Sequence, residues 1–175
     1  QLTLKDLPIP SLNEDEALVE VKACGLCHHD LLVMAGVLRR GVRLPLVLGH
    51  EIAGQVVDVG GGVTNVAPGD RVVCLPANAC GRCDRCLQGQ EHHCLYRRGF
   101  GHNIDGGMAQ YIAARSFSLI KVPTQISWVE ACLLGCPIGV GLQALKDVAE
   151  VEAGEVVLIT GAGGGLGVHL VQLAK

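Results

Sequence analysis

Short runs of alternating apolar and polar residues dominate the first two thirds of the chain. Glycine, proline and aspartate separate these runs, and such punctuation is typical of strands joined by tight turns. The pattern predicts four strands, at 17–23, 52–59, 71–75 and 108–113. One short helix is expected among them at 28–35, since apolar residues line one side of it and Gly36 follows its last turn. This succession of short strands is typical of a β barrel or sandwich.

Helical spacing of apolar residues replaces the strand pattern after Pro123. It predicts a helix over 128–145, a strand over 156–160 and a further helix from 166. This is the start of a β-α-β arrangement, and it stops with one strand and one helix. Since one strand cannot form a stable open sheet, we expect a truncated chain, with one domain over 1–122 and the start of a second over 123–175.

The composition argues against several classes of partner. Seventeen acidic and fourteen basic residues give a net charge of −3, and there is no dense basic tract to bind a nucleic acid. We expect no apolar run long enough to cross a bilayer, and the N-terminus has no basic-then-apolar signal pattern. The chain is therefore interpreted as cytoplasmic, with neither nucleic-acid nor membrane partners.

Nine cysteines are many for 175 residues, and four of them lie between 80 and 94. Their spacings of two, two and seven residues suit one loop wrapped around one ion better than mutual disulfides. Four thiolates leave no open coordination position, so we interpret the site as structural zinc. An iron centre or cluster, or four unrelated core cysteines, are the alternatives. The ligands would be Cys80, Cys83, Cys86 and Cys94.

A glycine cluster, TGAGGGLG at 160–167, follows the last predicted strand and precedes the last predicted helix. This context suits a dinucleotide fingerprint, in which the backbone and a helix N-terminus approach a pyrophosphate. Ala162 interrupts the strict pattern, and a variant would use Gly161, Gly164, Gly165 and Gly167. A glycine-rich turn without a ligand is the alternative. The residue that selects NAD or NADP would come about twenty positions after this cluster, beyond Lys175.

Five segments, in order, resemble the zinc-dependent medium-chain alcohol dehydrogenase family: CGLCHHD, PLVLGHEIAG, VGGGVTNVAPGDRV, CGRCDRC with a further cysteine after seven intervening residues, and the glycine cluster. The resemblance covers essentially the whole chain. It implies a mainly β fold with some α, in which a GroES-like barrel catalytic domain precedes the truncated start of a Rossmann domain. It also implies hydride transfer between an alcohol, or its carbonyl, and NAD or NADP.

The resemblance assigns a second, catalytic zinc to Cys27, His50 and Cys136. Three protein ligands leave a fourth position for water or a substrate oxygen, as catalysis by zinc requires. Glu51 resembles the family's acidic residue behind the metal, and Asp30 resembles the carboxylate that orients the His50 imidazole. These two residues are therefore expected to support the catalytic metal.

His29 departs from the family pattern, because alcohol-oxidising relatives usually carry serine or threonine there as the start of a proton relay. An imidazole can also accept that proton. His29 therefore narrows the pocket, replaces the relay, or marks another substrate class, such as carbonyl or acyl-thioester-linked substrates. The neighbouring His28 stands where relatives carry a basic residue near the cofactor pyrophosphate.

Together, the motifs and the resemblance predict a zinc-containing alcohol dehydrogenase with two zinc ions per chain and NAD or NADP as cofactor. Its substrate would be a small alcohol or carbonyl compound, and the full-length protein would be a homo-oligomer, a dimer or a tetramer. The chain alone is expected to be inactive, because it lacks most of the cofactor domain. Two rival functions are an NADPH-dependent reductase of an activated double bond in the same superfamily and a zinc-holding β module without catalysis.

Overall fold

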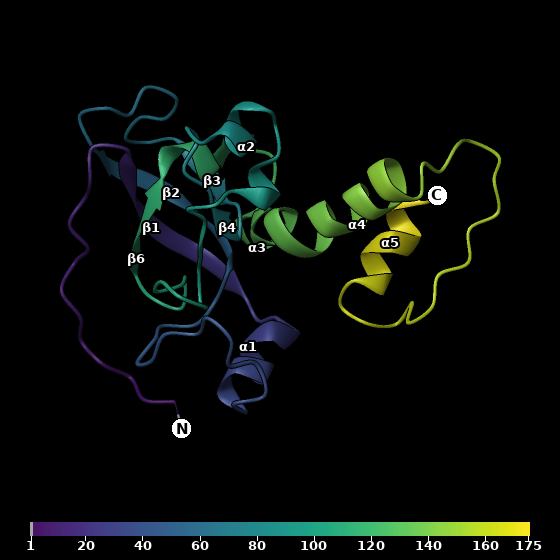
Figure 1. Ribbon diagram of the computed structural model, residues 1–175, viewed down its shortest axis with the longest axis horizontal. Helices are drawn as coiled ribbons and strands as arrows, with labels where there is room; N and C mark the ends of the chain where they lie inside the picture. Colours follow the sequence, from purple (N-terminus) through teal and green to yellow (C-terminus); the bar gives the residue numbers. More distant parts are fainter. Residues whose placement is uncertain (1) are drawn as a thin grey trace.

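The computed structural model describes residues 2–175. Figure 1 shows a β-rich body from which one long helix extends toward the C-terminal part. The main antiparallel sheet has the order β6-β1-β2-β3-β7, with β1 (Glu16–Gly25), β2 (Glu51–Val59), β3 (Arg71–Cys74), β6 (Tyr111–Arg115) and β7 (Leu119–Lys121). A second pair consists of β4 (Ala77–Asn78) and β5 (Arg98–Gly99).

The helices are short within the β-rich body and consecutive after it. The body carries α1 (His28–Met34), α2 (Asp84–Leu87) and two 3-10 turns, η1 (Glu91–His93) and η2 (Ser116–Ser118). The long helix consists of α3 (Trp128–Leu133), the π-helical η3 (Leu134–Ile138), α4 (Gly139–Gln143) and the π-helical η4 (Ala144–Val148). The last helix, α5 (Gly167–Leu173), packs against α4 (Figure 1).

Alternating side chains of the sheet form one apolar core. Its fully buried members come from β1, β2, β3 and β6, and they include Ala17, Val19, Ile52, Val72, Cys74 and Ala114. Valine and isoleucine suit such a pleated, buried surface. The strands predicted at 17–23, 52–59 and 71–75 are thereby confirmed, as is the short helix before Gly36, whose positive φ of 67° ends α1.

The strand predicted at 108–113 begins later, at Tyr111. The segment before it pairs elsewhere, because the backbone N–H groups of Gly106, Gly107 and Met108 donate to carbonyls of residues 47–49. A backbone group that is already bonded to a loop cannot join the sheet ladder. The start of this strand was therefore predicted three residues too early.

The start of the long helix is fixed by its own cap and by β3. The Ser127 N–H donates to Glu130 Oε2 at 2.9 Å, and the Glu130 N–H donates to Ser127 Oγ at 3.3 Å, which is a capping box. The Arg71 guanidinium from β3 stacks 3.5 Å from the centroid of the Trp128 ring. Its Nη2 also donates to the Ile126 carbonyl at 2.6 Å. These contacts hold the first turn of α3 on the sheet.

The strand predicted at 156–160 is not formed, and that prediction is wrong for the described chain. Residues 149–166 contain no strand, and Val156 and Leu158 are almost fully exposed. A parallel strand is stable only beside other strands that accept its hydrogen bonds. None of the described strands lies in this part of the chain. The helix predicted to follow is confirmed as α5.

The expectation that no segment is long and apolar enough to cross a bilayer is also wrong. The continuous helix Trp128–Val148 has 21 residues and passes that test by length and composition alone. The sequence predicted most of this helix, over 128–145, but glycine and proline interrupt its apolar run without ending the helix. A single such helix is weak evidence for a membrane, since core helices of water-soluble proteins pass the same test.

Candidate metal centres

Four cysteine sulfurs meet in the lobe formed by residues 79–97. The Sγ of Cys83 lies 3.6 Å from that of Cys86 and 3.9 Å from that of Cys94, and the Sγ atoms of Cys80 and Cys86 are 4.0 Å apart. A zinc ion about 2.3 Å from each of four tetrahedral thiolates would place neighbouring sulfurs about 3.8 Å apart. The sulfur separations in the lobe therefore fit one closed, four-thiolate ion site.

The electrostatics of the lobe favour thiolate at one ligand. The Cys86 N–H donates toward the Cys83 sulfur and is the main reason why the pKa of the Cys83 thiol falls to about 6. The turn before Cys83 needs Gly81, which has a φ of +71° and whose missing Cβ would lie 2.8 Å from Phe117. Glycine at this position lets the chain turn tightly and bring Cys80 and Cys83 to the same point.

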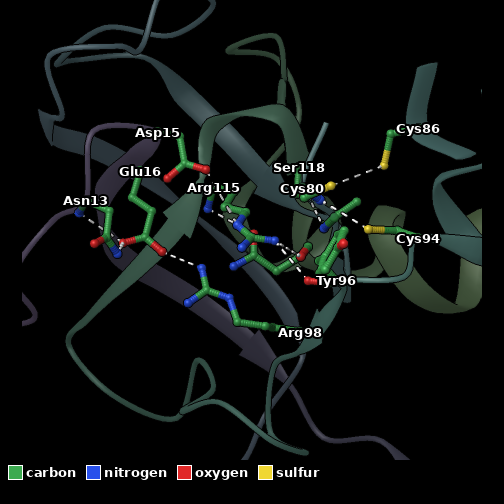
Figure 2. Close-up of polar contacts among 12 residues, drawn as sticks. Asn13, Asp15, Glu16, Cys80, Cys86, Cys94, Tyr96, Arg98, Arg115 and Ser118 are labelled. Atoms are coloured by element: carbon green, nitrogen blue, oxygen red, sulfur yellow. Dashed lines mark hydrogen bonds and ion pairs between the residues drawn. The ribbon is translucent and has the colours of Figure 1, made fainter. Parts of the chain in front are cut away.

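Polar contacts join the lobe and the adjoining strand β5 to the main sheet (Figure 2). An Arg98 Nη2 donates to Glu16 Oε1 at 2.5 Å, and Asn13 Nδ2 donates to Glu16 Oε2 at 2.7 Å. Burial alone would raise the pKa of Glu16, but the Arg98 and Asn13 contacts hold it below its ordinary value. Arg115 of β6 donates to the Tyr96 carbonyl at 3.1 Å. The lobe is thus fastened at its base, which is where a structural site would support the fold.

A second cluster joins three segments that are far apart in sequence. One ligand atom each from Cys27, His50, Glu51 and Cys136 lies within 4.8 Å of the others. Cys27 stands at the N-terminus of α1, His50 and Glu51 at the start of β2, and Cys136 in the π-helical turn η3. His50 and Glu51 are buried. The set offers two sulfurs, one imidazole and one carboxylate, which is a donor set that suits zinc.

Cys136 reaches this cluster because its helix approaches β3 closely. The Cβ that Gly135 lacks would lie 2.8 Å from the Cys74 carbonyl oxygen, so only glycine lets the helix come this near. The π-helical turn around Pro137 also shifts the direction of the side chains relative to a regular α-helix. Burial raises the pKa of the Cys136 thiol to about 12. A cation is therefore needed to hold this sulfur as a thiolate at neutral pH.

Asp30 connects the segments that carry Cys27 and His50. It is fully buried, and its Oδ2 accepts from the Cys27 N–H at 2.9 Å while its Oδ1 accepts from the Gly49 N–H at 3.1 Å. The same Oδ1 lies 3.7 Å from His50 Nδ1. Burial alone would raise the pKa of Asp30, but His50 and the two N–H groups lower it below its ordinary value. The carboxylate thus faces one ring nitrogen of His50 and leaves the other for an ion.

Replacing Asp30 by asparagine is expected to weaken zinc binding at the second cluster by about 10- to 100-fold, the range known for residues that orient a metal-ligating histidine. Asparagine keeps the shape and removes the charge that faces His50. Isothermal titration of the metal-free chain with Zn²⁺ measures the effect, and the four-cysteine site serves as the internal reference. Equal affinity in both proteins would show that Asp30 does not orient this ligand.

The charge of Asp30 also has a defined pH dependence. Because its pKa in the folded chain is below the ordinary value, its stabilising contribution is complete above the ordinary carboxyl range. That contribution is lost only as the pH falls through the lowered pKa.

Three histidines lie side by side at the second cluster. The His29 Nε2 is 3.3 Å from the His102 Nδ1, and the His29 and His50 rings meet edge to face with centroids 4.9 Å apart. Burial, followed by the neighbouring His50, lowers the pKa of His29 below its ordinary value. His102 was assigned no role from sequence. No motif links it to His29, which lies 73 positions earlier; the glycines in GFGHN indicate a tight turn but no partner for the histidine.

The loop that carries His102 packs directly on the backbone next to His50. A Cβ at Gly101 would lie 2.9 Å from the Gly49 N, and one at Gly106 would overlap the Gly49 carbonyl oxygen. A Cβ at Gly107 would lie 2.5 Å from Ile52 Cγ1. Gly49 itself has a φ of +93°. At Gly101, Gly106 and Gly107 this loop therefore packs against residues 48–52 without room for a side chain.

The remaining predicted residues are not members of this cluster. His28 is exposed on α1. The glycine loop lies beyond the far end of the long helix, before α5 (Figure 1). Within it Gly164 donates to the Gly161 carbonyl at 2.9 Å, and a Cβ at Gly167 would overlap that same carbonyl oxygen. The loop is thus a tight turn that leads into a helix.

Comparisons with known proteins identify related chains. A family model described as the alcohol dehydrogenase GroES-like domain matches residues 13–124. An acryloyl-coenzyme A reductase from Metallosphaera sedula is 38% identical over 172 residues, which cover 98% of this chain and 51% of the relative. An alcohol dehydrogenase from Geobacillus stearothermophilus is 41% identical over 175 residues, 99% of this chain and 51% of the relative. The chain spans about half the length of these curated relatives.

A solved structure agrees with the architecture described above. The cobalt- and zinc-bound thermostable alcohol dehydrogenase from Pyrobaculum aerophilum superposes with a TM-score of 0.89 at 31% identity, covering 99% of this chain and 52% of that one. Together with the family match, this likeness confirms the predicted mainly β, GroES-like fold with some helix.

Proposed function

The chain belongs to the medium-chain alcohol dehydrogenase family through its GroES-like domain, and from that premise we propose that it is the metal-binding catalytic part of an oxidoreductase. The proposed reaction interconverts an alcohol and its carbonyl compound. The observation that carries the proposal is the meeting of Cys27, His50 and Cys136 from three distant segments at one point. Two thiolates and one imidazole would hold zinc and leave one position for substrate.

A zinc ion at this centre would act as a Lewis acid on the substrate oxygen, and a nicotinamide cofactor would exchange a hydride with the substrate carbon. The residues of the chain would prepare that chemistry. Asp30 would orient the His50 imidazole through its Oδ1. Glu51, buried beside the same ligands, would add negative charge behind the ion.

The cofactor would bind toward the C-terminal part of the chain. We assign Gly161, Gly164, Gly165 and Gly167 to the pyrophosphate, because a turn without side chains before a helix lets the backbone approach an anion. His28, exposed near the start of α1, is a candidate for a further phosphate contact. We place the division between the catalytic and cofactor domains at residues 122 and 123, which the family match over 13–124 supports.

The lobe with Cys80, Cys83, Cys86 and Cys94 would hold a second zinc with a structural role, because four sulfurs leave no position for substrate. The proposal as a whole is tested with a full-length enzyme that carries this chain. We expect two zinc ions per chain by elemental analysis and alcohol-dependent reduction of NAD or NADP. If the full-length enzyme neither oxidised primary or secondary alcohols nor reduced the matching carbonyl compounds, the proposal would be contradicted.

His29 is proposed to pass the substrate proton to His102, since their ring nitrogens are 3.3 Å apart. Replacing His29 by alanine in the full-length enzyme is expected to lower alcohol oxidation by about 100-fold, the lower end of general acid-base contributions. The zinc content should stay unchanged, because His29 is not among the proposed ligands. Turnover equal to that of the parent enzyme would remove His29 from the reaction.

A second candidate function is the reduction of an activated double bond in an acyl-thioester. Two observations favour it: the 38% identity to an acryloyl-coenzyme A reductase, and a histidine where alcohol-oxidising relatives usually carry serine or threonine. The two candidates differ in their substrates. Oxidation of NADPH with an unsaturated acyl-coenzyme A, without any reaction with alcohols, would favour the reductase, and one zinc ion per chain would point the same way.

A further inference from the structure

We infer that Gly25 is a positioning residue for Glu51, and through Glu51 for the ion that we propose at Cys27, His50 and Cys136. Gly25 is the last residue of β1 and pairs with Glu51, the first residue of β2, in the antiparallel register. The inference rests on the proposed function, because it concerns the same metal centre.

The side chain of Glu51 occupies the space where a side chain at position 25 would be. A Cβ built on Gly25 would overlap Glu51 Oε2 and would lie 3.0 Å from its Cβ and 3.2 Å from its Cδ. The Cβ of Glu51 is fixed by the strand, so only the carboxylate end could move away. Gly25 has no positive φ, so its role is to leave space and not to permit an unusual backbone.

The position of this carboxylate matters because of what surrounds it. An oxygen of Glu51 lies within 4.8 Å of the donor atoms of Cys27, His50 and Cys136, and the residue is 5% exposed. Two thiolates and a neutral imidazole only balance the charge of Zn²⁺, and a carboxylate held nearby attracts the cation further. A side chain at position 25 would force that carboxylate out of its present place beside these donor atoms.

Metal affinity tests this arrangement without an activity assay. We expect Gly25→Ala to weaken Co²⁺ binding at the cysteine-histidine centre by about 10-fold, similar to the loss of other residues that support metal ligands. Glu51→Ala should have a similar effect. The double variant should lose no more than either single variant, because both changes remove the same contact. A chelator competition followed by thiolate-to-cobalt absorption measures all four proteins.

A matched glycine separates positioning from general damage. Gly54 lies in the same strand pair, where a Cβ would overlap the Glu20 carbonyl oxygen, and β2 carries it away from the ligands. Gly54→Ala should lower the melting temperature and leave the cobalt affinity of the folded chain unchanged. An equal loss of affinity in Gly54→Ala, an unchanged affinity in Gly25→Ala, or additive losses in the double variant would overturn the inference.

Thermal stability gives a second readout that needs no metal. If the alanine at position 25 clashes with the Glu51 carboxylate, removing that carboxylate should relieve the strain. Gly25→Ala with Glu51→Ala is therefore expected to melt at a higher temperature than Gly25→Ala alone, even where the single variant scarcely folds. A double variant that melts no higher would refute the role of Gly25. Absence of cobalt binding in the unmodified chain would instead refute the proposed function.

Discussion

Replacing His50 by alanine is expected to lower the activity of a full-length enzyme carrying this chain by about 10³-fold or more, since a Lewis-acid metal supplies several kcal/mol to such reactions. His50 is the only imidazole among the proposed ligands of the second cluster. Without it, two cysteines from distant segments and a carboxylate remain, and we expect the ion to be lost. Steady-state kinetics and elemental analysis measure the two effects together.

The zinc content of the His50 variant should fall by one ion per chain, and the ion of the four-cysteine lobe should remain. His169→Ala is the control, because this histidine lies on α5, outside both ion sites within the described residues. Full zinc content together with normal turnover in the His50 variant would show that the cluster is not the catalytic centre. A fall in turnover with full zinc content would separate catalysis from metal binding.

Replacing Cys94 by serine is expected to release the ion of the four-cysteine lobe and to unfold that lobe locally. Binding of zinc to small four-ligand sites contributes about 10 kcal/mol or more of apparent free energy, which small domains use to fold. Its loss should therefore expose the segment 79–97 to hydrogen exchange. The sheet has its own apolar core and should keep its protection. Hydrogen exchange with mass spectrometry resolves the two parts.

His92→Ala is the matched control for the lobe, because His92 is exposed and lies two residues before Cys94. It should retain zinc and protection from exchange. Equal exchange in the Cys94 variant and the unmodified chain would contradict a structural ion site. Loss of protection across the whole sheet would mean that the contacts of Arg98 and Arg115 couple the lobe to the body more strongly than local unfolding allows.

Local patterns predicted most of the β-rich body. Alternation of apolar residues gave three strands close to their bounds, because a strand buried on one face depends on its own period. The position of Gly36 correctly ended α1 for the same local reason. The cysteine spacing predicted the four-cysteine site, and the family resemblance predicted Cys27, His50 and Cys136 as a second one. In the structure the ligand atoms of each set lie within 4.8 Å of one another. Their roles as ligands remain proposals.

Features that depend on distant partners could not be predicted in this way. The segment 156–160 has the composition of a strand, but a strand also needs a neighbour. His102 contacts His29 and Gly25 faces Glu51, and nothing in their local sequence shows those contacts. Such pairs are visible only once the chain is folded.

The close packing of residues 99–107 on the Gly49 backbone limits how this family of chains can diverge. Almost any substitution at Gly101 or Gly106 would displace the backbone of Gly49, which directly precedes His50. A substitution far from the proposed ligands in sequence would therefore lower the affinity for the metal ion. Segment 36–46 is partly or fully exposed, and its main constraints are the positive φ values of Gly36 and Gly41 and the Arg43 N–H that donates to the His102 carbonyl. Substitutions at the other exposed positions of this segment are therefore expected to be tolerated before any change at Gly101 or Gly106.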